Sequence, residues 1–185
     1  MKNTSTKAIV AAGLGAALFM MMFVFVKIPS PVPEINIQLA YAIAAFFSAL
    51  FGPVSGFLIG FIGHALNDCI AIGSPWWSWN IASGVCGAIM GLSSKKVAPA
   101  VEVGTFGKDQ IIPFVVHVLI GHAIAFLIVA PVLDLLIYRK PANLAFTQGL
   151  MAFISDFLVA SIVGSVLLKA YAATKTGKGQ LAKED

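Results

Sequence analysis

The chain has 185 residues, of which 59% are hydrophobic and only 11% are charged, and its mean hydropathy is +0.93. A soluble domain carries about 25% charged residues, so this composition excludes a water-soluble protein and indicates one that lies mostly in lipid. The net charge of +4 does not indicate nucleic-acid binding, because the basic residues stand at the ends of apolar runs.

Apolar runs predict six membrane-spanning helices in chain order, since one span needs about 20 mostly apolar residues. The run that begins near Ile37 is too long for one helix, and Gly52-Pro53 divides it into two short ones. The expected helices are 8–26, 37–51, 53–72, 80–94, 111–137 and 146–173. We therefore expect an all-α integral membrane protein, in which residues 1–173 form one compact six-helix bundle and residues 174–185 a polar tail.

The basic residues predict the orientation of this bundle, because they prefer the cytoplasmic side of a membrane. Six spans place both termini, the turn at Gly52 and the loop 93–110 on one side. That side carries Lys2, Lys7, Lys95, Lys96, Lys108, Lys169, Lys175, Lys178 and Lys183, whereas the other carries Lys27, Arg139 and Lys140. Both termini are therefore expected in the cytoplasm.

The first outer loop, residues 27–38, contains three prolines, which fix the backbone and block helix formation. We expect a stiff, extended loop that presents Glu34, Asn36 and Gln38 near the mouth of the bundle. It is either a plain connector or a lid over a binding site.

Polar side chains at the outer end of the third helix predict a binding site. His64, Asn67 and Asp68 are three or four residues apart and share one helix face. The loop that follows holds Trp76, Trp77, Trp79 and Asn80. The tryptophans form either an interfacial aromatic belt or a wall on which a planar ring stacks. In the second case Asp68 suggests a protonated ring nitrogen or amine on the ligand.

Three further polar residues lie in the last two helices. Asp134 follows Pro131, which is expected to kink its helix near Leu127, and this carboxylate either lines the site or pairs with Arg139 or Lys140. Gln148 is a further weak candidate for the site. Asp156 is expected near the bilayer midplane with His122 as its partner, in a structural hydrogen bond or a proton relay.

Motifs for nucleotide hydrolysis and for hydrolytic enzymes are absent: the chain has no G-x-x-x-x-G-K-[S/T], H-E-x-x-H or G-x-S-x-G. Cys69 and Cys86 show neither metal-ligand spacing nor a disulfide framework. We therefore expect no enzyme activity, no metal and no cofactor. If the protein transports a solute, the energy must come from a partner or from an ion gradient.

Small residues recur at intervals of four in two helices, where they allow another helix to approach closely. Gly52, Gly56 and Gly60 are expected to pack inside the bundle or against a partner. The stripe Ala8, Ala12 and Ala16 in the first helix either packs inside the bundle or forms a docking surface for another protein.

Together with the alanine stripe, four segments resemble the substrate-binding (S) component of an energy-coupling factor (ECF) vitamin transporter, in the subfamily labelled riboflavin-type. They are PSPVPEINIQL (29–39), FGPVSGFLIGFIGHALND (51–68), GSPWWSW (73–79) and APVLDLLIY (130–138). The resemblance spans nearly the whole chain. It implies a six-helix protein of a bacterial plasma membrane that binds a vitamin or precursor from outside. The implied partners are a membrane coupling protein (T component), which contacts the alanine stripe, and two cytoplasmic ATPases.

The family's pocket residues vary, so the resemblance does not supply the substrate. From the residues we predict a small planar ring, such as hydroxymethylpyrimidine or another thiamine precursor, or a pyridine of the B6 type. The predicted binding residues are Asn36, Gln38, His64, Asn67, Asp68, Trp76, Trp77, Trp79, Asn80, Asp134 and Gln148. Two alternatives stay open: a stand-alone proton-coupled carrier that uses His122 and Asp156, and a membrane enzyme with His64 and Asp68 as an acid–base pair.

Overall fold

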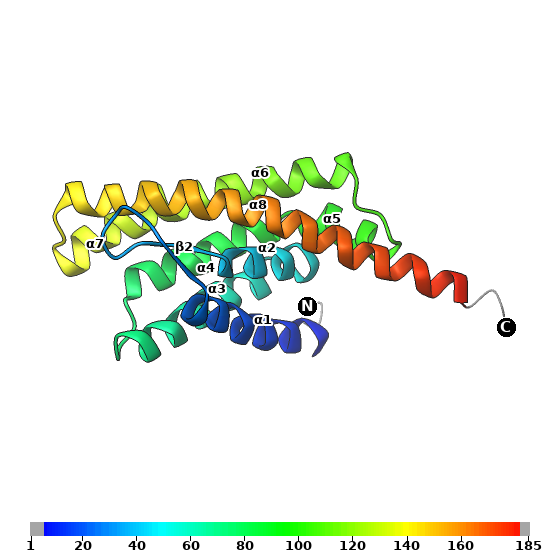
Figure 1. Ribbon diagram of the computed structural model, residues 1–185, viewed down its shortest axis with the longest axis horizontal. Helices are drawn as coiled ribbons and strands as arrows, with labels where there is room; N and C mark the ends of the chain where they lie inside the picture. Colours follow the sequence, from blue (N-terminus) through cyan, green and yellow to red (C-terminus); the bar gives the residue numbers. More distant parts are fainter. Residues whose placement is uncertain (1–5, 182–185) are drawn as a thin grey trace.

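The computed structural model describes residues 6–181, with side chains described as far as residue 175, and it is built almost entirely of helices (Figure 1). The helices are α1 (Thr6–Phe25), α2 (Ala40–Phe51), α3 (Pro53–Ala71), α4 (Trp77–Gly91), α5 (Ser94–Glu102), α6 (Lys108–Ile124), α7 (Ala130–Tyr138) and α8 (Ala142–Leu181). A π-helical turn, η1 (Ala125–Val129), joins α6 to α7. The first part of the predicted polar tail continues α8, and residues 182–185 lie outside the described residues.

Four helical stretches are long and apolar enough to cross a membrane: Thr6–Phe25, Pro53–Ala71, Lys108–Tyr138 and Ala142–Lys175. The predicted membrane class is therefore confirmed, but the count of six spans is not. Helix α2 has only 12 residues, or roughly 18 Å at 1.5 Å per residue, which is less than a typical hydrocarbon core. The expected loop 93–110 also contains α5, because Val97 and Val101, four residues apart, are both fully buried.

The proline-rich segment after α1 forms a hairpin of two short antiparallel strands, β1 (Lys27–Pro29) and β2 (Asn36–Gln38). Lys27 pairs with Gln38 and Pro29 pairs with Asn36. The expectation of an extended segment is confirmed. The expectation of an all-α chain needs this small correction, since the hairpin crosses the mouth of the bundle.

Glycines bring α3 and α4 into close contact within the bundle. A Cβ at Gly56 would overlap the carbonyl oxygen of Gly87, and a Cβ at Gly60 would overlap that of Ser83. The glycine stripe of α3 therefore serves packing inside the bundle, which was one of the two readings of this pattern. The close approach also positions Ser83 beneath the polar end of α3.

The alanine stripe of α1 is mostly covered by the protein itself. Ala12 and Ala16 are 5% and 3% exposed, and Ala16 packs against Gly63 of α3. Ala12 and Ala16 therefore pack within the bundle and are not a free surface of the described chain, whereas Ala8 is partly exposed. Docking of a partner on this stripe stays a prediction. The face of α1 that stays open carries Gly13 and Ala17 instead.

The perturbation predicted around Leu127 is the π-helical turn η1. Pro131 has no N–H to donate to the carbonyl of Leu127, so the regular hydrogen-bond ladder is interrupted there. The Phe126 carbonyl then packs directly against Gly149 of α8.

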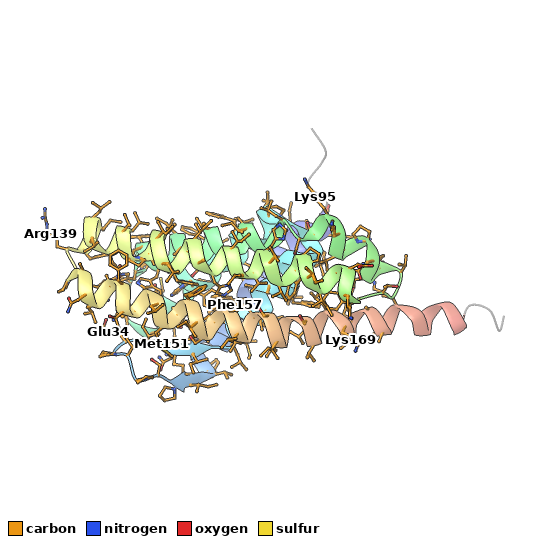
Figure 2. The ribbon with its side chains drawn as sticks, turned by 90° about the horizontal axis from the view of Figure 1, so that it is seen from above. Glu34, Lys95, Arg139, Met151, Phe157 and Lys169 are labelled. Atoms are coloured by element: carbon orange, nitrogen blue, oxygen red, sulfur yellow. The ribbon has the colours of Figure 1, made fainter. Side chains whose placement is uncertain are left out.

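Different segments of the chain lie at the two ends of the bundle. Helix α1 begins and α8 ends toward the same end, where α5 also lies, and the hairpin and the α7–α8 junction lie at the other (Figure 1). Figure 2 shows Glu34 and Arg139 at the hairpin end, and Lys95 and Lys169 toward the α5 end.

Candidate functional site

A cavity of about 370 Å³ lies at the hairpin end, between the hairpin, α1, α2, α3, the start of α4 and α8. The tryptophans, expected in a loop, lie at this start of α4. Its volume is within the range of roughly 300–1,000 Å³ that small-molecule sites occupy. Eight of the eleven predicted binding residues line it: Asn36, Gln38, His64, Asn67, Asp68, Trp76, Trp79 and Gln148. The fold thus gathers side chains that are up to 112 positions apart, from Asn36 to Gln148, around one space.

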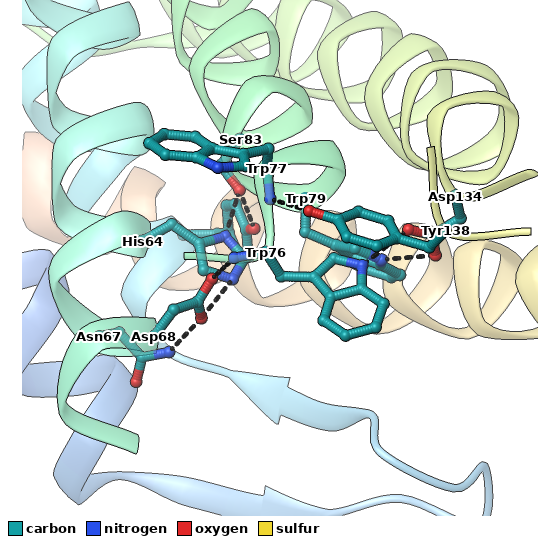
Figure 3. A network of polar contacts seen from close by, with 10 residues as sticks. His64, Asn67, Asp68, Trp76, Trp77, Trp79, Ser83, Asp134 and Tyr138 are labelled. Carbon is teal, nitrogen blue, oxygen red and sulfur yellow. Dashed lines mark hydrogen bonds and ion pairs between the residues drawn. The ribbon is translucent and has the colours of Figure 1, made fainter. Parts of the chain in front are cut away.

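His64 and Asp68 belong to a buried chain of polar contacts on one side of this cavity (Figure 3). The Nδ1 of His64 shares a hydrogen bond of 2.7 Å with the Ser83 hydroxyl, which in turn lies 2.8 Å from the Tyr41 hydroxyl. The Nε2 of His64 lies 3.6 Å from Oδ1 of Asp68. The ring of Phe23 packs on the imidazole with 4.5 Å between centroids. His64 is therefore held in one orientation from three sides.

The Asp68 carboxylate is occupied by neighbours from two segments. Its Oδ1 accepts a hydrogen bond of 3.1 Å from Nδ2 of Asn67, and its Oδ2 accepts one of 2.9 Å from the backbone N–H of Trp76. Asp68 thereby ties the end of α3 to the start of α4. It orients Asn67 and Trp76 in the wall.

Asp134 lies behind the wall and does not line the cavity. It is fully buried and accepts hydrogen bonds from the indole N–H of Trp76 at 2.8 Å and from that of Trp79 at 3.0 Å (Figure 3). It also accepts one from the Ser78 hydroxyl. Lys140 lies 3.9 Å away, so the alternative of a pair with this lysine has support. One carboxylate thus fixes the orientation of two tryptophan rings.

The structure separates the three tryptophans. Trp76 stacks on Tyr138 with 4.2 Å between ring centroids, and Trp79 packs on Phe126 at 5.6 Å. Trp77 is 47% exposed and stacks on Phe61 on the outside of the bundle, where the interfacial interpretation fits it.

Asn80 is fully buried, but it lies outside the cavity lining. Trp77 and Asn80 are thus the two predicted wall residues, besides Asp134, that the fold leaves out of the cavity. Helix periodicity explains this, because consecutive residues of α4 point in different directions and, of Trp77, Trp79 and Asn80, only Trp79 faces the cavity.

The hairpin is attached to the bundle by Asp156 of α8. Oδ1 of Asp156 accepts a hydrogen bond of 3.0 Å from the backbone N–H of Gln38 and one of 3.1 Å from the Ser155 hydroxyl. The predicted partner, His122, instead contacts the Val118 carbonyl at 2.8 Å and the Cys86 sulfur at 3.5 Å. The expectation of an Asp156–His122 pair is therefore wrong, and Asp156 belongs to the cavity lining.

Glu34 forms a second attachment between the hairpin and the bundle. Its Oε2 accepts hydrogen bonds of 3.1 Å from Nε2 of Gln148 and from Nζ of Lys140. These contacts, first that with Gln148 and then those with the Lys140 ammonium, lower the pKa of the Glu34 carboxyl below its ordinary value of 4.5. The Gln148 amide also donates to the Pro33 carbonyl at 2.9 Å.

Sequence reasoning did not assign Phe23, Tyr41, Lys140 or Asp156 to the site, although all four line the cavity. In the sequence, Phe23 and Tyr41 resemble ordinary core residues, and Lys140 resembles a charge at the rim. Only the lone carboxylate of Asp156 in an apolar helix could have indicated a place in the site. Within the described residues, no group of three or more His, Cys, Asp or Glu side chains could hold a metal ion, and both Cys69 and Cys86 are free.

Comparisons with known proteins identify the family to which this chain is similar. A family model described as "ECF-type riboflavin transporter, S component" matches residues 3–173. A UPF0397 protein of Lactococcus lactis subsp. cremoris is 46% identical over 184 residues, covering 100% of both chains. A UPF0397 protein of Clostridium perfringens is 43% identical over 180 residues, covering 97% of this chain and 96% of the relative. The crystal structure of the S-component for biotin from an ECF-type ABC transporter superposes with a TM-score of 0.61 at 16% identity, covering 92% of this chain and 93% of that one, which shows a shared fold.

Proposed function

Because this chain belongs to the ECF-type riboflavin transporter S-component family, whose members are the substrate-binding subunits of ECF transporters, we propose that it captures a small vitamin or vitamin precursor from outside the cell. The observation that carries this proposal is the cavity of about 370 Å³ at the hairpin end. Aromatic faces, amides and carboxylates converge on it, as expected of a site for a small polar ring.

The proposed orientation has the hairpin end outside and both termini in the cytoplasm. The placement of Lys95 and Lys169 toward the α5 end supports it, since basic residues prefer the cytoplasmic side (Figure 2). In this proposal residues 1–173 form one membrane domain of the bacterial plasma membrane. The short helices α2 and α4 cross only part of the hydrocarbon layer and are shielded by their longer neighbours.

The proposed substrate is a planar heterocycle, either a pyrimidine such as hydroxymethylpyrimidine or a pyridine of the B6 type. Trp76 and Trp79 offer aromatic surface to such a ring, and Asp134 holds their indole groups in place. The riboflavin in the family's description and the biotin of the structural neighbour are properties of those proteins and are not part of this proposal.

The proposed partners are a T component and two cytoplasmic ATPases, which would supply the energy for import. Near the α5 end, a groove of about 540 Å³ runs between α1, α2, α5 and α8. Val10, Leu14 and Phe51 give it an apolar lining. Its position beside the open face of α1 supports docking of a partner helix there rather than on Ala12 and Ala16.

Two measurements test this function. Native mass spectrometry of the purified full-length protein identifies any small molecule that co-purifies, and titration calorimetry measures its affinity. We expect binding by this chain alone, and uptake into vesicles only when T component, ATPases and ATP are present. Uptake by this chain alone, driven by a proton gradient, would replace the proposal with the stand-alone carrier.

A further inference from the structure

Three amide side chains that line the cavity carry a carbonyl oxygen without a hydrogen-bond partner in the described part of the chain. They belong to Gln38, Asn67 and Gln148, which are 5%, 4% and 0% exposed. A buried polar atom without a partner is uncommon because it loses its hydration without compensation. Three of them around one cavity therefore call for an explanation.

Neighbouring acceptors fix the orientation of two of these amides. The Nδ2 of Asn67 donates to Oδ1 of Asp68 at 3.1 Å. The Nε2 of Gln148 donates both to the Pro33 carbonyl at 2.9 Å and to the Glu34 carboxylate at 3.1 Å. Rotating either amide by half a turn would set oxygen against oxygen, since carbonyls and carboxylates only accept hydrogen bonds. The two carbonyl oxygens are thus left unpaired by the same contacts that hold the amides.

Several donors around the cavity are, in contrast, already engaged. The indole N–H groups of Trp76 and Trp79 both donate to Asp134, and the ammonium of Lys140 donates to Glu34. The hydroxyl of Tyr41 shares its hydrogen bond with Ser83. The cavity therefore offers acceptors from three elements, namely β2, α3 and α8, while the donors named above are engaged within the protein. Lys27 also lines the cavity and adds a cationic donor.

We propose, on the premise of the proposed function, that the ligand is a heterocycle whose edge is rich in hydrogen-bond donors, with a primary amino or ammonium group. The carbonyl oxygens of Gln38, Asn67 and Gln148 accept its N–H groups and determine specificity. Asp68 acts through Asn67 as a positioning residue. A site built to accept such donors rejects an analogue that places an oxygen there, because two acceptors then face each other.

Two matched ligand pairs test this inference by titration calorimetry on the purified full-length protein. The first pair is 4-amino-5-hydroxymethyl-2-methylpyrimidine and its 4-oxo analogue. The second is pyridoxamine and pyridoxal, which have the same pyridine ring. We expect the amino member to bind more tightly by at least about tenfold in whichever pair fits the cavity.

Variants of Gln38 test whether its carbonyl oxygen contributes to the preference for the amino ligand. Gln38→Met removes the acceptor at similar length and is expected to reduce the preference for the amino ligand severalfold, whereas Gln38→Glu keeps an acceptor and preserves the preference. Ser161→Ala is the matched control, because Ser161 also has a buried, unpaired oxygen but lies outside the cavity. We expect it to leave the preference unchanged.

The outcomes separate this inference from the proposed function. Equal affinities within a pair, or tighter binding of the oxo or aldehyde member, would overturn the donor-rich ligand while the binding function stands. A folded protein that binds neither ring would remove the proposed substrate class, and this inference with it. An unchanged preference in Gln38→Met, with the amino ligand still favoured, would remove Gln38 from the set of specificity-determining residues.

Discussion

Nζ of Lys140 lies 3.1 Å from the Glu34 carboxylate, and this contact joins the hairpin to the junction between α7 and α8. The same ammonium lies 3.9 Å from Asp134 and 5.5 Å from the ring centroid of Trp76. One lysine therefore contacts both the cover of the cavity and the carboxylate that orients its aromatic wall. In the proposed function this contact is a latch of the outward-facing site.

Replacing Lys140 with Met tests this latch. The Lys140 side chain is largely buried but the Glu34 side chain is 70% exposed, so the pair is screened by solvent and contributes modestly. We expect ligand dissociation to accelerate about two- to fivefold, with a smaller change in association. Stopped-flow tryptophan fluorescence measures both rates. Arg139→Met, which removes the neighbouring cation, is the control, and an equal acceleration there would assign the effect to general charge.

The pKa of Glu34 predicts how the latch responds to acid. The pKa is lowered in the folded protein, so the contacts of the ionised carboxylate are fully present above its ordinary value of 4.5 and are lost as the pH falls through the lowered pKa. We expect dissociation of the ligand to accelerate only below about pH 4.5. Glu34→Gln, measured over the same pH range, should remove this acceleration of dissociation at low pH. If the acceleration persists in the variant, another group causes it.

Asp134 is predicted to act on the ligand through Trp76 and Trp79. Asp134→Ala removes the acceptor of both indole N–H groups, and we expect it to weaken ligand binding by about tenfold or more and to shift the tryptophan emission. Asp134→Asn keeps one acceptor oxygen, so its ligand affinity should lie between those of the wild type and Asp134→Ala. This variant also controls for a loss of affinity caused by misfolding.

The three tryptophans are predicted to respond differently to substitution. Trp76→Phe and Trp79→Phe remove ring surface and an indole N–H from the wall of the cavity, and we expect each to weaken binding severalfold in titration calorimetry. Trp77→Phe changes a ring on the outside of the bundle and should leave the affinity within about twofold. A loss in Trp77→Phe as large as in the other two would restore Trp77 to the site.

The sequence predicts much of this arrangement, for identifiable physical reasons. Residues three or four apart on one helix must share a face, so His64, Asn67 and Asp68 were found together. Prolines exclude a helix in the segment that forms the hairpin, and Pro131 located the π-helical turn. These inferences depend on local geometry alone.

What the sequence did not predict depends on contacts between distant segments. The partner of Asp156 is a backbone N–H of β2, and a backbone group leaves no trace in a residue pattern. Asp134 faces Trp76 and Trp79 because α7 packs against α4, which no spacing reveals. Ala16 is covered because Gly63 of α3 has no side chain to hold α1 away.

Close packing of α3 on α4 predicts a clear difference between two glycine variants. Gly56→Ala places a Cβ against the carbonyl of Gly87, whereas Gly13→Ala meets no atom within 4 Å. Overpacking costs about 1–3 kcal/mol, so we expect the apparent melting temperature of Gly56→Ala in detergent to fall by several degrees. Gly13→Ala should melt like the wild type. Equal melting temperatures would show that α3 and α4 are not in contact as described.

Gly13 also allows the partner surface to be tested separately from ligand binding. Gly13 lies on the open face of α1 and outside the cavity lining, and a Cβ there meets no atom within 4 Å, so we expect Gly13→Trp to add bulk outside the bundle. We expect the purified variant to bind its ligand with unchanged affinity, because the cavity lining is untouched. In vesicles with the T component, the ATPases and ATP, uptake should fall at least about tenfold, because helices that pack on small residues cannot approach over an indole.

Ala12→Trp would not serve this purpose, since Ala12 is buried and the variant would disturb the packing of α1 in the bundle. Normal uptake by Gly13→Trp would place the docking surface elsewhere, and lost ligand binding would mean that α1 supports the cavity from its outer face as well.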